Sequence, residues 1–279
     1  MKHIVFILAA FSLATNSLAQ VSSKTETVKF VKFGDVFELK LISTDSLDYL
    51  KKTQPKFCSS KDEFPKLAPK GYVYDGIICE YDFDNNGLDD YLLFIRATKR
   101  ENFELEYFWN GIERDTLIDR NPRGYLLVMN RKERFEVTSF NYECFPSANE
   151  SGGNYFPPEL DISPINFTNN GNGIEVSYWH GRYGNWGYSF KYKDGDFILT
   201  KYNNNESMSW IAEFTRTVII NFESSEIEIS ELKNTDEYLD YIHNYENGID
   251  DENFELIYET KKDTINFEST IKMSQMTDI

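Results

Sequence analysis

One short segment of the chain has the residue types and the spacing of a cation-binding loop. Reading from Asp82, side-chain oxygens stand at positions one, three, five and nine, supplied by Asp82, Asp84, Asn86 and Asp90. Gly87 occupies position six, where such loops turn sharply, and the backbone carbonyl of Leu88 is available at position seven. Calcium takes about six to eight oxygen ligands from a curled loop of this kind. The spacing therefore predicts a structural calcium site.

The predicted loop differs from an EF-hand. Position twelve carries Leu93 in place of the bidentate Glu, and the flanking residues alternate as in β-strands. The sequence therefore predicts a calcium loop set between two strands. The Asn86-Gly87 pair also fits a plain hairpin turn with solvated acids, although four oxygen side chains in register favour the cation.

A second segment, Tyr178–Tyr188, combines aromatic rings with Arg, Asn and Gly. Rings beside hydrogen-bonding side chains, with glycines that admit a ligand to the backbone, are typical of a carbohydrate or peptide platform. In that interpretation Trp179 and Trp186 stack on the ligand, and Arg182 donates hydrogen bonds to it. The same composition fits a hairpin whose rings pack on its own sheet, and strand alternation favours packing.

Short alternating stretches separated by Gly, Asn and Asp predict the elements that position these residues. They indicate a mainly β fold, a single sandwich-like domain of antiparallel sheet with one or two short helices. Strands are predicted at Thr27–Phe33, Val36–Leu41, Tyr72–Glu80, Tyr91–Ala97, Phe103–Trp109, Tyr125–Asn130, Phe135–Phe140, Gly173–Tyr178, Trp186–Lys193, Phe197–Tyr202, Thr215–Phe222, Glu226–Ser230 and Phe254–Thr260. A helix is predicted from Thr44 or Asp45 to Leu50 and another over Asp236–Tyr245, while Asp194-Gly195 predicts a hairpin turn.

The same pattern divides the chain into four parts. Residues 1–19 have the basic start, short apolar run and small-residue end of a cleavable signal peptide. Residues 20–70 are N-terminal strands and an irregular, Pro-rich lead-in, and residues 71–205 are the main β domain with the Asp-rich loop. Residues 206–279 are C-terminal strands and a short helix, packed on the main domain.

The predicted signal peptide also sets the location. Cleavage before Gln20 predicts an exported protein, periplasmic or extracellular. The alternative is a short membrane anchor, but the apolar run Ile4–Leu13 is too short to span a bilayer. We therefore expect no membrane insertion after cleavage.

The charge of the chain limits the classes of partner that it can bind. The chain has 46 acidic and 29 basic residues, a net charge of -17 and no basic run, which excludes nucleic acid and anionic lipid as partners.

Cys58, Cys79 and Cys144 allow at most one intramolecular disulfide, and the sequence does not choose among the three pairings. A catalytic cysteine needs a nearby base, and nothing in the sequence places a histidine beside a thiol. We therefore expect the three cysteines to be small buried side chains.

The order of several segments resembles a known family. Gly71-Tyr72 is followed by the Asp82–Asp90 loop and the strand Tyr91–Ile95, then by Arg123–Val128, Ser151–Gly153, Tyr188–Tyr192 and Asp194–Leu199. Over about half of the chain, Gly71–Tyr202, this order is similar to exported bacterial proteins of poorly defined function that carry one calcium loop of the FG-GAP/VCBS type. The resemblance implies an exported β protein with a cation at Asp82, Asp84, Asn86 and Asp90. One motif cannot build a multi-bladed propeller, and Asn86 in place of Asp lowers the expected affinity.

The function that these observations favour is non-catalytic. The sequence contains no nucleophile elbow, phosphate loop, dinucleotide fingerprint or paired metal-binding histidines. We expect an exported binding or interaction protein, stabilised by calcium, with a glycan or a protein as its partner. Two alternatives remain open: a secreted hydrolase that acts on glycans through acidic residues near the aromatic segment, and a structural envelope protein whose Asp loop is only a turn.

Overall fold

Antiparallel β-sheets make up most of the protein. The computed structural model describes residues 25–106, 116–145, 166–167, 172–179, 184–207, 214–248, 254–265 and 270–277, and the predicted signal peptide lies outside them. These residues form four sheets, of seven, five, three and two strands. The prediction of a mainly β, antiparallel, sandwich-like domain with short helices is confirmed. No helix within the described ranges is long and apolar enough to cross a membrane.

A seven-stranded meander is the largest sheet, and its strands follow one another in chain order. It contains β10 (Asn166–Phe167), β11 (Gly173–Trp179), β12 (Gly184–Lys193), β13 (Asp196–Glu206), β14 (Arg216–Asn221), β15 (Glu226–Leu232) and β16 (Tyr258–Thr264). Asp194 and Gly195 join β12 to β13 with φ values of 53° and 85°. A two-residue hairpin turn of type I′ has positive φ at both central residues, so the hairpin predicted at this pair is confirmed.

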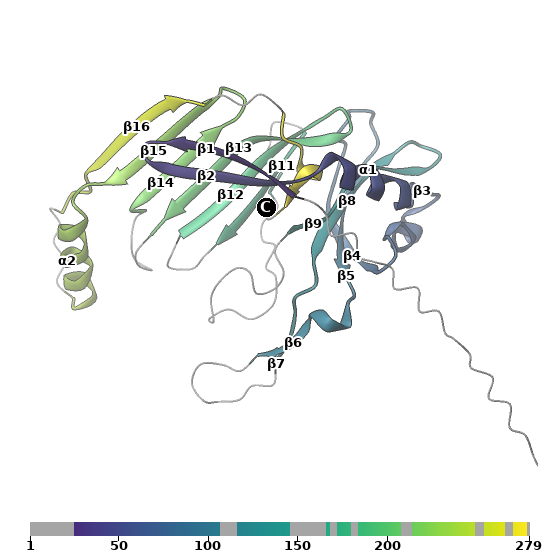
Figure 1. The fold of residues 1–279 in the computed structure, drawn as a ribbon, viewed down its shortest axis with the longest axis horizontal. Helices are drawn as coiled ribbons and strands as arrows, with labels where there is room; N and C mark the ends of the chain where they lie inside the picture. Colours follow the sequence, from purple (N-terminus) through teal and green to yellow (C-terminus); the bar gives the residue numbers. More distant parts are fainter. Residues whose placement is uncertain are drawn as a thin grey trace, which may run out of the picture.

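A five-stranded sheet lies at one end of the meander (Figure 1). Its order is β3-β9-β8-β5-β4, and it contains β3 (Phe57–Cys58), β4 (Tyr72–Tyr81), β5 (Asp90–Ala97), β8 (Arg123–Asn130) and β9 (Phe135–Phe145). Successive side chains of the central strands point to opposite faces and enter two different cores. The first core joins the two large sheets and includes Phe83, Leu92, Tyr125, Leu127, Val176, Phe190 and Phe197. The second core covers the other face and includes Phe64, Leu67, Leu93, Ile95 and Leu126.

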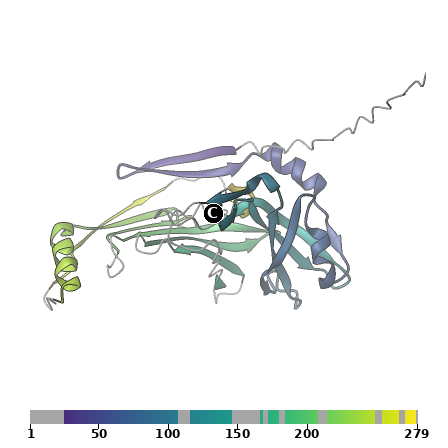
Figure 2. The same ribbon diagram turned by 90° about the horizontal axis from the view of Figure 1, so that it is seen from below.

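The N-terminal hairpin forms a further layer over one face of the meander (Figure 2). Its strands β1 (Thr25–Lys32) and β2 (Asp35–Ile42) pair with each other, and β17 (Met276–Thr277) extends this small sheet. Leu39 reaches the first core, while Phe37 packs against a third apolar cluster, which includes Val218 and Ile220 of the meander. Helix α1 (Thr44–Thr53) follows β2 and precedes β3 of the five-stranded sheet.

The C-terminal segment, residues 270–277, fills space between the two large sheets. Its 3-10 helix η4 (Met273–Gln275) contacts β9 and β13. Met273 of this helix and Met276 of β17 are buried in the first core. Asn141 of β9 is also buried. Its Nδ2 donates hydrogen bonds to the carbonyl oxygens of Met273 at 3.1 Å and Met276 at 2.5 Å. One side chain therefore supplies two of the backbone partners that this short segment needs.

The remaining elements are short. They are the 3-10 helices η1 (Lys61–Leu67) and η2 (Arg100–Asn102), strands β6 (Phe103–Glu106) and β7 (Thr116–Asp119), and helix α2 (Thr235–Glu246) at the far end of the meander. The end of the strand predicted at Phe103–Trp109 lies outside the described residues. The helix predicted to end at Leu50 extends to Thr53.

Two predicted elements need correction. The Pro-rich lead-in, predicted to be irregular, contains helix η1, because Phe64 and Leu67 are buried in the second core. The strand predicted at Phe254–Thr260 begins only at Tyr258. The residues before it bond to a side chain instead: Asn234 accepts the N–H of Ile257 at 3.0 Å and donates to the carbonyl oxygen of Glu255 at 2.9 Å.

All three cysteines are free and buried, which confirms the expectation that they act as small buried side chains. Burial raises the pKa of the Cys79 thiol to about 12, and burial also raises the pKa of Cys58 and Cys144 above the usual value. The thiolate is the reactive form of cysteine. None of the three is therefore set up as a nucleophile.

Replacing Asn141 by alanine tests the attachment of the C-terminal segment. The change leaves the carbonyl oxygens of Met273 and Met276 without their buried donor, so we expect the free energy of unfolding to fall by about 1–3 kcal/mol. Urea unfolding measures this loss, with Asn244→Ala on the exposed side of α2 as the control. Equal stability of the two variants would show that Asn141 does not hold the segment.

Candidate metal centre

The Asp-rich loop joins β4 to β5, and one apolar side chain anchors it. Phe83 lies between two of the predicted ligands, has no exposed surface and belongs to the first core. Its ring centroid is 5.1 Å from that of Phe197 and 6.0 Å from that of Tyr192, both on the β12–β13 hairpin. Burying a Phe side chain contributes about 1.5–3 kcal/mol. The loop is therefore held where the two large sheets meet.

Asp90, the first residue of β5, is fully buried. Its Oδ2 accepts a hydrogen bond from the backbone N–H of Phe83 at 2.9 Å, and its Oδ1 accepts one from the N–H of Asn130 at 2.8 Å. Because Asn130 ends β8, this carboxylate fastens the loop to the turn between β8 and β9. Each carboxylate oxygen keeps a second lone pair that can face a cation.

Asp82 curls the rest of the loop around its own carboxylate. Its Oδ1 accepts the backbone N–H of Asn86 at 2.9 Å, and its Oδ2 accepts that of Gly87 at 2.8 Å. The chain turns with positive φ at Asn85 (56°) and Gly87 (83°), and Gly and Asn adopt this region most readily. The sharp turn predicted at Gly87 is confirmed.

The curled loop brings three carboxylates together. Within the described ranges, Asp82, Asp84 and Asp90 form the one group of three or more His, Cys, Asp or Glu side chains that could hold a metal ion, with one possible ligand atom from each all within 4.8 Å of one another. The Oδ1 of Asp84 is buried without a hydrogen-bond partner, while its Oδ2 accepts a bond from Nη1 of Arg131 at 2.5 Å. A buried oxygen without a partner is unfavourable, and a cation bound by all three carboxylates would satisfy it.

The other two predicted ligand residues lie on the exposed turn of the same loop. The Oδ1 of Asn86 accepts the N–H of Leu88 at 2.8 Å, and its Nδ2 donates to the carbonyl oxygen of Asn130 at 3.3 Å. Asn86 thus tightens the loop and docks it on the β8–β9 turn. The structure unites Asp82, Asp84 and Asp90 in one cluster, and the side-chain oxygen of Asn86 is engaged within the loop.

Arg131 is a part of the site that the sequence analysis missed. It lies in the β8–β9 turn and forms ion pairs with Asp84 at 2.5 Å and with Glu136 at 3.4 Å. It is 47 residues from Asp84 in sequence, so no local spacing indicates the contact. The positive charge of its guanidinium neutralises part of the negative charge of the cluster, and it therefore opposes the binding of a metal cation there.

The pKa of Asp90 reflects this environment. Burial raises it to about 6, and the negative charges of Asp84 and Asp82 add to the rise. The two N–H donors that Asp90 accepts act in the opposite direction. A bound cation stabilises the charged carboxylate, so a proton and a cation compete for Asp90.

The aromatic segment is described only in part. Trp186 of β12 is half-buried and packs against the first core, with its backbone opposite Tyr178 of β11. Trp179 ends β11, but its side chain lies outside the described residues, and so does the whole of Arg182. The position of Trp186 agrees with the interpretation in which these rings pack on the sheet. A ligand platform at Trp179, Arg182 and Trp186 stays a prediction.

No protein-family model, curated protein or solved structure matches the chain. Its function therefore has to be argued from the chemistry of the site. The cluster offers carboxylate oxygens, which are hard ligands suited to calcium and magnesium. The resemblance to proteins with one FG-GAP/VCBS-type loop stays a prediction.

Competition between proton and cation predicts a pH dependence. Asp90 must be ionised to bind a cation, and its raised pKa places that ionisation near pH 6. We expect millimolar calcium to raise the melting temperature fully at about pH 7.5 and progressively less as the pH falls through about 6. Scanning fluorimetry at about pH 5 and 7.5 measures the difference, and a calcium effect of equal size at both would contradict it.

In chelator, a rise in pH through the pKa of Asp90 has the opposite effect on stability. The folded state then holds the Asp90 proton more tightly than the unfolded state, in which the pKa has its ordinary value of 3.8. This contribution to stability is fully present below the ordinary value and is lost as the pH rises through about 6. The same fluorimetry series in chelator provides the comparison.

Proposed function

We propose that the protein is a non-catalytic, exported binding protein whose β4–β5 loop holds one calcium ion as a structural brace. The observation that supports a bound cation is the cluster of Asp82, Asp84 and Asp90, in which the buried Oδ1 of Asp84 has no hydrogen-bond partner. Together with the Leu88 carbonyl, the second lone pair of the Asn86 side-chain oxygen and water, these carboxylates can supply the roughly six to eight oxygens that calcium takes.

The position of the cluster supports a structural role for the ion. Asp82 and Asp90 already accept backbone N–H groups of the loop, and Asp90 and Asp84 connect it to the β8–β9 turn. An ion that removes the repulsion among the three carboxylates would tighten both connections. The loop would then stabilise the junction of the two large sheets through Phe83.

Export makes a weak calcium site useful. Extracellular calcium modules bind at about 10⁻⁴–10⁻³ M, so a site weakened by Asn86 at the fifth position and by the charge of Arg131 can still fill. The signal-like residues 1–19 support this location. The buried thiols, with their raised pKa values, support a role without a cysteine nucleophile.

Thermal unfolding of the chain from Gln20 onward, in chelator and in millimolar calcium, tests the proposal. Calcium at about a hundred times its dissociation constant adds roughly 2.7 kcal/mol, which raises the melting temperature by several degrees. We expect the rise in the wild type and in Asp89→Ala, an exposed acid of the same loop outside the cluster, and no rise in Asp82→Ala/Asp84→Ala. An identical response of wild type and double variant would leave the loop as a turn.

Replacing Arg131 by glutamine separates a cation site from a cluster that needs only its arginine. The change removes a positive charge beside Asp84, so calcium should bind roughly tenfold more tightly, while the protein in chelator becomes less stable. Calcium titrations followed by melting temperature measure both effects. If the variant is less stable and calcium does not stabilise it, Arg131 alone compensates the charge of the cluster and the loop is not a cation site.

A further inference from the structure

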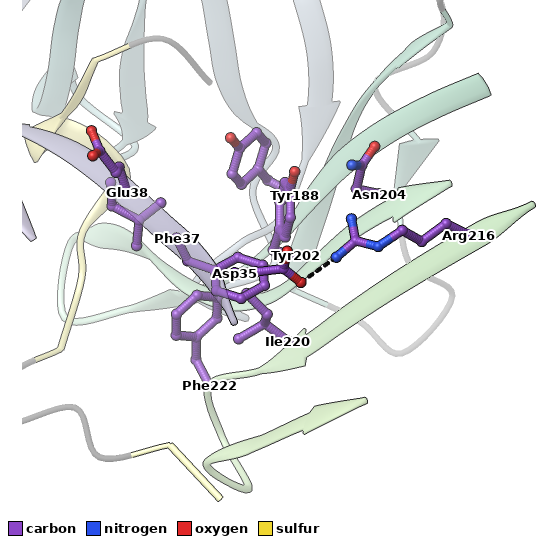
Figure 3. A pocket seen from close by; sticks show the side chains of 10 residues that line it. Asp35, Phe37, Glu38, Tyr188, Tyr202, Asn204, Arg216, Ile220 and Phe222 are labelled. Carbon is purple, nitrogen blue, oxygen red and sulfur yellow. Dashed lines mark hydrogen bonds and ion pairs between the residues drawn. The ribbon is translucent and has the colours of Figure 1, made fainter. Parts of the chain in front are cut away.

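A pocket of about 290 Å³ lies between the N-terminal hairpin and the meander. Asp35, Phe37, Glu38 and Leu39 of β2 form one side of it, and residues of β12, β13 and β14 and the adjoining Phe222 form the other (Figure 3). Its volume is just below the roughly 300–1,000 Å³ that is typical of ligand sites. The pocket therefore has room for one ring-sized ligand.

Aromatic rings supply most of the apolar wall. Tyr188 and Tyr202 lie on neighbouring strands with ring centroids 5.1 Å apart, and Phe37 and Phe222 face the same space. Tyr188 is almost fully buried, and the other three are half-buried. Flat apolar ring faces with a polar tip suit a ligand that is apolar on its faces and polar at its edge.

The polar wall offers donors and acceptors side by side. Arg216 points toward Asp35 across the pocket (Figure 3), and it also pairs with Glu206 at 3.0 Å and Glu231 at 3.4 Å. Asn204 donates from its Nδ2 to Glu206 at 3.2 Å, which leaves its Oδ1 available as an acceptor. A hydroxyl group both donates and accepts, so this wall matches a ligand with several hydroxyls.

The charges select against ionic ligands. An anion would have to displace carboxylates from Arg216, which already faces three of them. A cation would meet the guanidinium of Arg216. A purely apolar ligand would cover the Oδ1 of Asn204 without giving it a hydrogen-bond partner, which is unfavourable.

We propose that this pocket binds one neutral sugar ring of a glycan, with the ring stacked on Tyr188 or Tyr202 and its hydroxyls bonded to Asp35, Asn204 and Arg216. The inference rests on the binding function proposed above and gives that function a ligand class and a place. The hairpin that forms one wall is tied to the meander by the Asp35–Arg216 ion pair and by Lys32 with Asp263 at 2.7 Å. The wall that the hairpin forms is therefore held on the meander by side-chain contacts.

Nuclear magnetic resonance titration of the full chain after signal cleavage tests the proposal. The neutral probes are glucose, galactose, mannose and N-acetylglucosamine, and the charged counterparts are glucosamine and glucuronate. At least one neutral probe should bind saturably and more tightly than either charged probe. In Asn204→Ala its affinity should fall by about tenfold, because a hydrogen-bonding partner in the pocket is lost.

The chain offers a matched control in Asn203→Ala. Asn203 is half-buried on the same strand, but successive strand residues point to opposite faces, so this change should leave binding unaffected. A Tyr202→Leu variant, checked for folding by its melting temperature, should lose binding as well. Equal effects of Asn203→Ala and Asn204→Ala, tighter binding of a charged probe, or no binding of any probe would overturn the inference.

Two further readouts separate this inference from the proposed function. Loss of sugar binding in Trp186→Leu, with binding retained in Asn204→Ala, would place the sugar site in the aromatic segment and overturn the pocket. The calcium-dependent melting temperature, measured on the same samples, reports the metal site independently. A calcium response without any sugar binding would refute the sugar pocket and leave the cation site in place.

Discussion

The buried carboxylate of Asp90 is the constraint on which the rest of the candidate site depends. A charge without exposed surface is tolerated only when hydrogen bonds or opposite charges compensate it. Asp90 obtains two backbone donors, from Phe83 and Asn130, and thereby fixes the loop to the β8–β9 turn. That arrangement places Asp82 and Asp84 beside a third negative charge. Arg131 relieves part of the repulsion, and a bound cation would relieve the rest.

Phe83 carries this constraint to the larger sheet. Its ring lies against Tyr192 and Phe197, next to the turn of the β12–β13 hairpin. The same two strands present Tyr188 and Tyr202 to the pocket under the N-terminal hairpin. A cation in the loop and a ligand in the pocket would therefore act on the same hairpin, the cation near its turn and the ligand farther along its strands. In this account the metal supports the scaffold, and the pocket provides the recognition.

Much of the fold could be predicted because its determinants are local. The Asp194-Gly195 turn and the alternating or fully apolar runs on either side of it and in β5 and β8 specify strands by themselves. The errors occur where contacts between residues distant in sequence determine the secondary structure. Helix η1 forms where Phe64 meets the second core, and β16 (Tyr258–Thr264) is a charged, mostly exposed strand without alternation. Only its pairing with β15 identifies it.

The same distinction applies to the sites. Asp82, Asp84 and Asp90 could be found because they lie on one loop with recognisable spacing. Arg131 could not, because only the packing of the β8–β9 turn brings it to the cluster. The pocket was beyond the sequence as well: Asp35 and Arg216 are 181 residues apart, and the hairpin must fold over the meander before they meet.

Equilibrium dialysis against calcium, with bound ion counted per chain, tests the central claim most directly. The account predicts one ion per wild-type chain at millimolar calcium and near neutral pH, and none in Asp84→Asn, a variant that removes one charge of the cluster and keeps the size of the side chain. No bound ion in the wild type, or the same number in both proteins, would contradict it.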